Sequence, residues 1–264
     1  MPSFTHLIIT RFMCDNFIKK DTGIDIDNEE WRKMSFDMAK RHIIPTLENQ
    51  SNKNFILVFL VSDTMSDSDI LDLEWLSGYI NIKVIKLSEF NNYIKSINTD
   101  YLITSRLDYD DHVYKDCVKD IHQLLKRKKP EVCIYGLNQG VSIVDGENES
   151  HLMYNYPWLL GEGFPAPMTT LILARSACKE YFDIYKLGFH TECVKCLLST
   201  QNYYLNKIYD IHQIYAQHKG YNIDYIWIRH PHSATTISIN VTHTTNIIVE
   251  LSDKELKENF GYII

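Results

Sequence analysis

The segment Tyr101-Leu-Ile-Thr-Ser-Arg-Leu-Asp108-Tyr-Asp110-Asp111-His-Val113 decides the fold of this 264-residue chain. Its apolar start predicts a short buried strand, which runs directly into an arginine and three carboxylates. Ligands of open α/β sheets bind beyond the carboxyl ends of such strands, so the acidic residues are the first candidates for a functional site. Three anions this close repel one another unless a cation or an arginine neutralises them.

Asp108 and Asp110 offer hard oxygen ligands, which suit Mn²⁺ or Mg²⁺ bound together with substrate phosphates. An ordinary alternative is a solvated turn, with Asp111 as the N-cap of the helix that follows. The buried strand before the cluster and Arg106 inside it favour the functional interpretation over a chance match.

The chain before this segment alternates between strands and helices. Apolar runs predict strands over residues 7–10, 55–61 and 82–87. Helical spacing predicts helices over residues 29–50, with a kink or break at Pro45, and over 66–79 and 89–97. Such alternation indicates βαβ units and a parallel sheet. Right-handed connections then place the first and fourth strand ends at the same edge of the sheet, which makes Arg11 and Asp108 neighbours.

The second half has a mixed pattern. Helices are predicted over residues 113–129, 176–187, 203–218 and 253–259. Strands are predicted over 132–135, 141–144, 151–154, 169–174 and finally 225–228. We interpret the chain as one domain, with a nucleotide-binding half (1–111), an acceptor half (112–236) and a C-terminal extension (237–264).

Composition limits the classes of function. The hydrophobic content of 45% and charged content of 23% are ordinary for a soluble globular protein. A net charge of −7 and a pI of about 5.9 argue against a general nucleic-acid binder. No apolar stretch reaches transmembrane length, and the first one is too short for a signal peptide. The six scattered cysteines are expected to be free thiols in a reducing, cytoplasmic compartment, against a redox or metal role for Cys193 and Cys196.

Taken together, several segments resemble a glycosyltransferase of the GT-A fold, and more narrowly the bacterial and viral rhamnosyltransferase family. The segments that carry this resemblance are Leu7–Phe12, the helix with Trp31, Arg41 and Pro45–Gln50, Phe59–Asp63, Ser105–Asp111 and Trp227–His232. They span residues 7 to about 236, and Arg106-Leu-Asp-Tyr-Asp-Asp111 is the most specific. The resemblance implies a Rossmann-like, mainly parallel sheet flanked by helices. It also implies metal-dependent, inverting transfer of a sugar, rhamnose among the candidates, from a UDP-, dTDP- or GDP-sugar to a glycan hydroxyl.

Residue roles are carried over by position in these segments. The resemblance implies that Asp110 and His232 bind the metal, that Asp108 contacts the donor sugar or ribose, and that Asp111 holds a metal-bound water or the acceptor. The other residues implied to contact the donor are Arg11, Asp63, Arg106, Arg229 and Ser233. The chain departs from the family where a His-Gly-x-Asn motif is replaced by His232-Ser-Ala-Thr, which weakens the case for phosphate contacts there.

Glycosyl transfer also needs a base that takes the proton of the acceptor hydroxyl. The candidates after the acidic residues are Glu162, Asp183, Glu192 and Asp210. We favour Asp210, which lies on the helix before the last predicted strand. Glu162 stands between Trp158 and Phe164 in a loop that would line the acceptor pocket, unless those aromatic rings simply pack in the core.

Three other functions remain open from the sequence. The same carboxylates would serve a metal-dependent nuclease or phosphotransferase, although an aspartate nucleophile is expected after the first strand rather than the fourth. A carbohydrate-binding protein without turnover would keep the same fold. Finally, His230 and His232 would face the same side of an extended segment and, with His212 or His218, make a zinc site.

Overall fold

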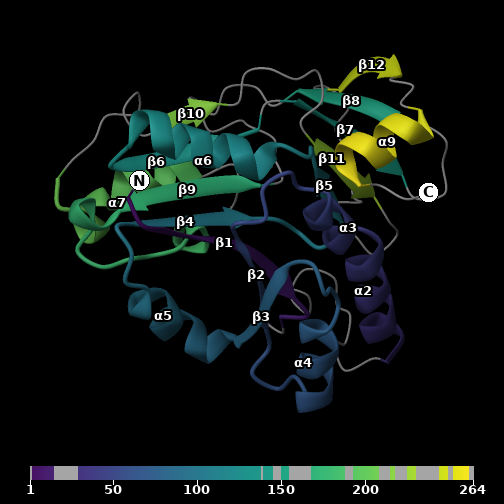
Figure 1. Ribbon diagram of the computed structural model, residues 1–264, viewed down its shortest axis with the longest axis horizontal. Helices are drawn as coiled ribbons and strands as arrows, with labels where there is room; N and C mark the ends of the chain where they lie inside the picture. The colour runs from purple at the N-terminus through teal and green to yellow at the C-terminus, as the bar shows by residue number, and fades with distance from the viewer. Residues whose placement is uncertain are drawn as a thin grey trace.

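The computed structural model describes residues 2–14, 29–137, 139–144, 150–154, 168–187, 193–207, 215–217, 225–229, 244–248 and 252–261. Within these ranges a seven-stranded sheet runs through the middle of the molecule in the order β10-β6-β9-β4-β1-β2-β3 (Figure 1). Its strands are β1 (Phe4–Phe12), β2 (Ile56–Val61), β3 (Asn81–Lys86), β4 (Tyr101–Arg106), β6 (Val132–Gly136), β9 (Thr169–Ala174) and β10 (Tyr215–Gln217). Every neighbouring pair is parallel except those that β9 makes with β4 and β6.

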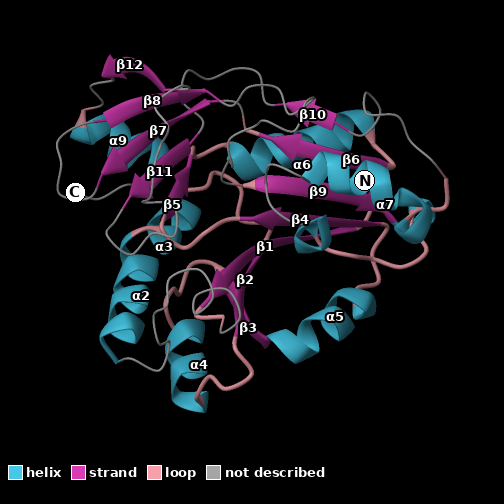
Figure 2. Cartoon of the chain, turned by 180° about the vertical axis from the view of Figure 1, so that it is seen from behind, coloured by secondary structure: helices cyan, strands magenta, loops and turns pink. Residues whose placement is uncertain are grey.

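A second sheet lies beside the first, at the end of the molecule where α9 (Asp253–Phe260) packs (Figures 1 and 2). Its order, among the described strands, is β12-β8-β7-β11-β5. These strands are β5 (Asp111–Val113), β7 (Gln139–Val144), β8 (Ser150–Tyr154), β11 (Tyr225–Arg229) and β12 (Thr244–Ile248). Since β4 belongs to one sheet and β5 to the other, the residues between them connect the two sheets.

Helices cover the first sheet. They are α2 (Glu29–Arg41), α3 (Ile43–Glu48), α4 (Asp67–Glu74), α5 (Leu87–Ser96), α6 (Cys117–Lys128) and α7 (Cys193–Tyr204), with short 3₁₀ helices η2 (Arg175–Ala177) and η3 (Ile184–Leu187). The Phe4 ring contacts His122 on α6, and Phe12 contacts Phe36 on α2. Because side chains alternate along a strand, α2 and α6 cover the same face of β1. These observations confirm the predicted class, a mixed and mainly parallel α/β sheet flanked by helices.

The N-terminal half follows the sequence prediction closely. The strands at β1, β2, β3 and β4 are confirmed, and so are helices within 29–50, 66–79 and 89–97. The first of these divides at His42, three residues before Pro45. Pro45 lies in the first turn of α3, where its missing N–H would have had no partner within the helix. The proline therefore starts a new helix instead of bending one.

Four expectations for the second half were wrong. Val113 belongs to β5 instead of starting a helix, and α6 begins only at Cys117. Residues 215–217, expected to end a helix, form β10, and β11 is followed by a further strand, β12. The predicted helix over 176–187 is instead two 3₁₀ turns with a non-helical stretch between them. For β5, β10 and β12, pairing with a strand far away in the sequence overrides the local pattern. Residues 176–187 instead follow the sheet in a largely non-helical conformation.

The C-terminal helix fixes the back of the acidic segment. Its C-cap, Gly261, has a φ of +68°, and a Cβ there would lie 2.5 Å from the Pro45 carbonyl oxygen on α3. His112 on β5 donates from Nδ1 to the carbonyl oxygen of Phe260, 3.2 Å away. Helix α9 thus closes over α3 and β5 behind the residues that connect the two sheets.

Candidate active site

The site is built at the edge where the parallel strands end, here called the carboxyl edge. Strands β1 and β4 pair in parallel with Ile9 opposite Arg106. Arg11 and Asp108 are each two residues further along, Arg11 near the end of β1 and Asp108 just past the end of β4, so they come to the same edge of the sheet, as predicted from the sequence. The chain then turns between Asp108 and Asp111, and the Asp111 N–H donates to the Asp108 carbonyl oxygen at 3.2 Å. We call residues 108–111 the acidic turn.

Tyr109 anchors the acidic turn to the core. Its ring packs edge-on against Phe12, with centroids 5.5 Å apart, and its hydroxyl lies near the Ser35 side chain on α2. Burial raises the pKa of Tyr109 well above its ordinary value, and the nearby Asp110 and Asp108 raise it further. The phenol therefore stays neutral. With the tyrosine held inward, the turn keeps the half-buried carboxylates of Asp108 and Asp110 on either side of it.

Arg106 supplies a cation next to the first carboxylate of the acidic turn. Its Nε lies 3.7 Å from Oδ1 of Asp108, and its side chain is only 8% exposed while that of Asp108 is 40% exposed. A buried guanidinium is costly to desolvate, so its place next to the acidic turn is a strong constraint on this part of the fold.

Tyr185, on η3, lies beside this pair. The guanidinium carbons of Arg11 and Arg106 are 5.2 and 5.0 Å from the centre of its ring, and its hydroxyl donates to the Ile9 carbonyl oxygen at 3.1 Å. Burial raises the pKa of Tyr185; the two arginines lower it and Asp108 raises it, so all three charges lie close to the phenol. Tyr185 was not among the site residues predicted from the sequence, because the apolar pattern of residues 176–187 predicts an ordinary packed helix.

Asp63 stands at the same edge, two residues past the end of β2. Its Oδ1 accepts from the backbone N–H and the hydroxyl of Ser88, at 3.0 and 2.7 Å, in the first turn of α5. These bonds hold the pKa of Asp63 below its ordinary value. The carboxylate thus ties β2 to α5, and its contact with a donor remains a prediction.

Asp111 and Asp183 occupy different surroundings from those expected. Asp111 is buried within β5, and α6 has Asp116 at its N-cap position, so the alternative in which Asp111 caps that helix was wrong. Asp183 is also buried, which raises its pKa, and its Oδ1 accepts from the Tyr185 N–H at 2.8 Å. Asp183 therefore organises the start of η3.

Strand β11 approaches the acidic turn from the second sheet. Trp227 is opposite Asp111 in the antiparallel β5–β11 pair, and the chain runs from there toward Arg229. The antiparallel direction brings the end of β11 alongside residues 109–110. The side chain of Arg229 lies outside the described residues. So do the candidates Glu162, Glu192, Asp210, His212, His218, His230, His232 and Ser233, with Trp158 and Phe164.

The described side chains set limits on metal and thiol chemistry. Among them, no group of three or more His, Cys, Asp and Glu is arranged to hold a metal ion by itself. The predicted pair of Asp110 and His232 is not tested by this, because His232 is not described. Of the cysteines whose side chains are described, Cys14, Cys117, Cys133, Cys178 and Cys196 are all free thiols. Within the same ranges, no helix has the length and apolar content to cross a membrane.

No family model and no curated protein matches this chain. Solved structures of similar shape include residues 1–349 of S. aureus TarS in complex with UDP, at 13% identity and a TM-score of 0.42, covering 85% of this chain and 60% of that one. The same protein in complex with UDP-GlcNAc is 13% identical with a TM-score of 0.43, and the match covers 86% of this chain and 58% of that one. A protein from Desulfovibrio desulfuricans G20, described as a nucleotide-diphospho-sugar transferase, is 9% identical with a TM-score of 0.40. That match covers 87% of this chain and 82% of that one.

The chain thus spans about 60% of the TarS fragment that it resembles. Identities and TM-scores at this level do not transfer an activity.

Proposed function

We propose that this protein is a metal-dependent GT-A glycosyltransferase, which moves a sugar from a nucleotide-diphosphate donor to a hydroxyl of a glycan. One observation carries the proposal: the ends of β1 and β4 bring Arg11, Arg106 and the acidic turn together at the carboxyl edge. Arginines suit a diphosphate, and neighbouring carboxylates suit the cation that accompanies it. The family resemblance of the same residues supports this combination.

The donor set fits a hard divalent cation. Asp108 and Asp110 are carboxylates on one hydrogen-bonded turn, and both are partly open to solvent. In the proposal, Asp110 and His232 hold Mn²⁺ or Mg²⁺, and Asp108 contacts the donor. A bound divalent cation supplies positive charge that stabilises the leaving diphosphate.

The chain's own residues account for the remaining requirements. Arg11 and Arg106 stabilise charge that develops on the diphosphate, with Asp63, Arg229 and Ser233 as further donor contacts. Asp210, or Glu162 in the loop around Trp158, takes the proton of the acceptor hydroxyl, and the reaction inverts the anomeric centre. Rhamnose is one candidate sugar, and the nucleotide is UDP, dTDP or GDP.

The first test is metal-dependent nucleotide binding. Calorimetric titration with UDP, GDP and dTDP should show at least tenfold tighter binding with Mn²⁺ or Mg²⁺ than in EDTA for one nucleotide, since the metal screens diphosphate from carboxylate charge. Asp110→Ala should abolish that difference. Equal affinity in EDTA would rule out the proposed metal site.

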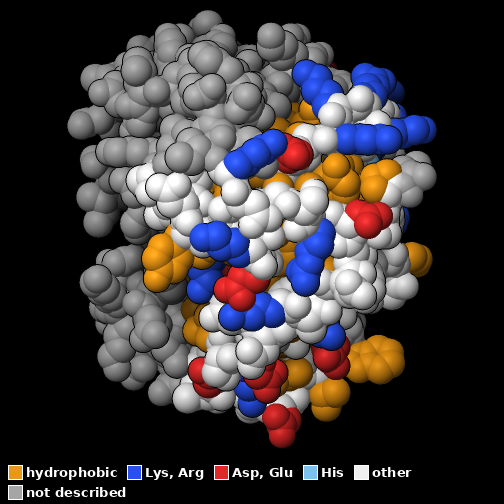
Figure 3. Space-filling model, turned by 90° about the vertical axis from the view of Figure 1, so that its left-hand side faces the viewer, with side chains coloured by type: hydrophobic (Ala, Val, Ile, Leu, Met, Phe, Trp, Pro, Cys, Tyr) orange, Lys and Arg blue, Asp and Glu red, His pale blue; other side chains and the backbone are white. Residues whose placement is uncertain are grey.

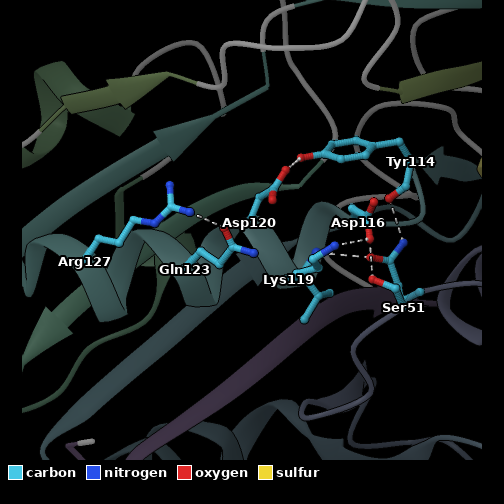
Figure 4. Close-up of polar contacts among 9 residues, drawn as sticks. Ser51, Tyr114, Asp116, Lys119, Asp120, Gln123 and Arg127 are labelled. Atoms are coloured by element: carbon cyan, nitrogen blue, oxygen red, sulfur yellow. Dashed lines mark hydrogen bonds and ion pairs between the residues drawn. The ribbon is translucent and has the colours of Figure 1, made fainter.

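Asp116→Asn is the matched control. Asp116 is also partly buried, but its carboxylate faces Ser51 and Lys119 at the start of α6, as Figure 4 shows, and neighbouring Tyr114 and Asp120 bond to each other. The control should keep the metal dependence. A panel of nucleotide sugars, with and without Mn²⁺, then separates sugar transfer from the alternative functions. Release of a nucleoside diphosphate indicates a glycosyltransferase, and binding alone indicates a carbohydrate-binding protein. Cleavage of a phosphate ester indicates a nuclease or phosphotransferase.

A further inference from the structure

Tyr185 and its neighbour Ile184 are held at the carboxyl edge by hydrogen bonds to both of the strands that carry arginines. The Tyr185 hydroxyl donates to the Ile9 carbonyl oxygen on β1 at 3.1 Å. One residue earlier, the Ile184 N–H donates to the Thr104 hydroxyl on β4 at 3.0 Å. The Tyr185 N–H itself donates to the buried Asp183 at 2.8 Å. One hydrogen bond therefore holds the ring hydroxyl, and two hold the backbone from which the ring projects.

Both arginines of the carboxyl edge contact the Tyr185 ring. Arg11 and Arg106 come from adjacent strands, and their guanidinium carbons lie 5.2 and 5.0 Å from the same ring centre. Two like charges repel, and the negative face of an aromatic ring offsets part of that repulsion. A ring at this point therefore lets two cations stay together at the end of the sheet.

We propose that Tyr185 is a positioning residue, which holds Arg11 and Arg106 as a pair for the diphosphate of the nucleotide donor. This inference rests on the proposed function and assigns a role to a residue outside the acidic turn. A diphosphate carries two adjacent anionic groups, and planar guanidinium groups bind such groups through paired N–H donors. Without the ring, the two side chains lose their common support, and the diphosphate meets them in many conformations.

Tyr181 provides a matched control four residues earlier. Its hydroxyl donates to the Thr99 carbonyl oxygen at 2.7 Å, and the Arg175 guanidinium carbon lies 4.8 Å from its ring centre. Thr99 precedes the start of β4 and Arg175 follows the end of β9, so both lie at the end of the sheet opposite the acidic turn. The same kind of contact is thus present at the end of the sheet where no donor is proposed to bind.

The test compares Tyr185→Leu, Tyr185→Phe and Tyr181→Leu in the full chain. Each is titrated with the nucleoside diphosphate that the wild type binds best, with the corresponding nucleoside, and with inorganic pyrophosphate, all in Mn²⁺. Tyr185→Leu should weaken binding of the diphosphate and of pyrophosphate about tenfold or more and leave nucleoside binding unchanged. Tyr185→Phe keeps the ring and should stay within about twofold of wild type for all three ligands, as should Tyr181→Leu.

Several results would overturn this role. Unchanged diphosphate affinity in Tyr185→Leu would do so, and so would an equal loss for the nucleoside, which would place the ring against the base. A large loss in Tyr185→Phe would show that the hydroxyl, rather than the ring, matters. If Tyr185→Leu does not fold, Tyr185→Met, which also removes the ring, replaces it in the same three titrations. A wild type that binds no nucleoside diphosphate would refute the proposed function itself, which is a separate outcome.

Discussion

Tyr181 and Tyr185 make the same pair of contacts at opposite ends of the sheet, yet charge is distributed in opposite ways around them. At the amino end Tyr181 is 2% exposed, and the arginine on its ring, Arg175, is exposed to solvent. At the carboxyl edge Tyr185 is half-buried, whereas the Arg106 side chain is buried. One end buries the ring beneath a solvated cation, and the other buries a cation beside the ring.

The difference shows where the fold accepts an energetic cost. Figure 3 views the end of the molecule where β1 begins, and charged side chains are scattered over the described surface there, with Lys and Arg predominant in its upper part. Charges on such a surface remain hydrated and cost little. A buried guanidinium is retained only when its neighbours compensate, and at the carboxyl edge those neighbours are Asp108 and Tyr185. The buried charge therefore lies at the end of the sheet where we propose that the donor binds.

The largest expected effect separates the two rings by stability. Tyr181→Leu should lower the free energy of unfolding by about 3 kcal/mol, because it leaves a cavity and removes the partner of the Thr99 carbonyl. Tyr185→Leu should cost about half as much, since that ring is only half-buried. Urea denaturation followed by circular dichroism measures both. The reverse order would mean that Tyr185 is the structural residue and Tyr181 the dispensable one.

A second contrast lies on the other face of β4. Ser105, next to Arg106, points toward β1 and α6, where its hydroxyl lies 2.8 Å from Nε2 of His6 and 2.7 Å from the Thr170 hydroxyl. His6 in turn lies 2.9 Å from Nε2 of His122 on α6. This network contains no carboxylate or arginine in the contacts described. The two faces of one strand end thus differ, with neutral groups on one and charged groups on the other.

The buried neutral histidines should make the free energy of unfolding depend on pH. Burial lowers the pKa of His122 to about 4, and burial together with His122 lowers that of His6. Burial, with His42 nearby, also lowers the pKa of His112 to about 3. The unfolded chain takes up these protons first, near pH 6.5, so stability is complete above that pH and falls as the pH drops toward 4 and then 3.

We expect a loss of about 2 kcal/mol per strongly shifted histidine across this range, after allowance for the partial exposure of His122. Urea titrations at pH 7.5, 6, 5 and 4 measure it, and His122→Gln should flatten the upper part of the profile. Ordinary carboxylates titrate mainly below pH 5, so the change between pH 7.5 and 5 reports chiefly on the histidines. An unfolding free energy that is flat from pH 7 to 5 in the wild type would contradict the assignment of neutral histidines.

The sequence was informative where the pattern of a single strand is enough to predict how that strand pairs. The continuous apolar runs of β1, β2 and β4 predict a parallel sheet, and parallel register then places Arg11 next to Asp108 without any further information. The acidic turn followed from residues adjacent in the chain. This part of the site, and the fold class with it, could therefore be predicted.

Residues that depend on a distant partner could not be found in this way. Strand β5 has three residues and pairs with β11 more than a hundred residues later, so no local pattern distinguishes it from the start of a helix. The segment from Tyr181 to Tyr185 crosses from Thr99 to Thr104 and Ile9. An extended chain covers about 3.3 Å per residue and a helix 1.5 Å, so only the non-helical path spans that length. Apolar spacing alone suits either conformation, which is why Tyr185 was missed.

The smallest expected effect concerns Arg175, and it tests whether an arginine on a tyrosine ring is functional by itself. Arg175→Met removes the guanidinium from the Tyr181 ring but keeps its backbone N–H on the Asp100 carbonyl. Because this cation is exposed, the free energy of unfolding should change by about 0.5 kcal/mol or less, and the change should shrink further in 0.5 M salt. Nucleoside diphosphate affinity should stay within about twofold of wild type. A tenfold loss of that affinity would mean that the amino end also meets the ligand, and the contrast between the two tyrosines would then lose its functional meaning.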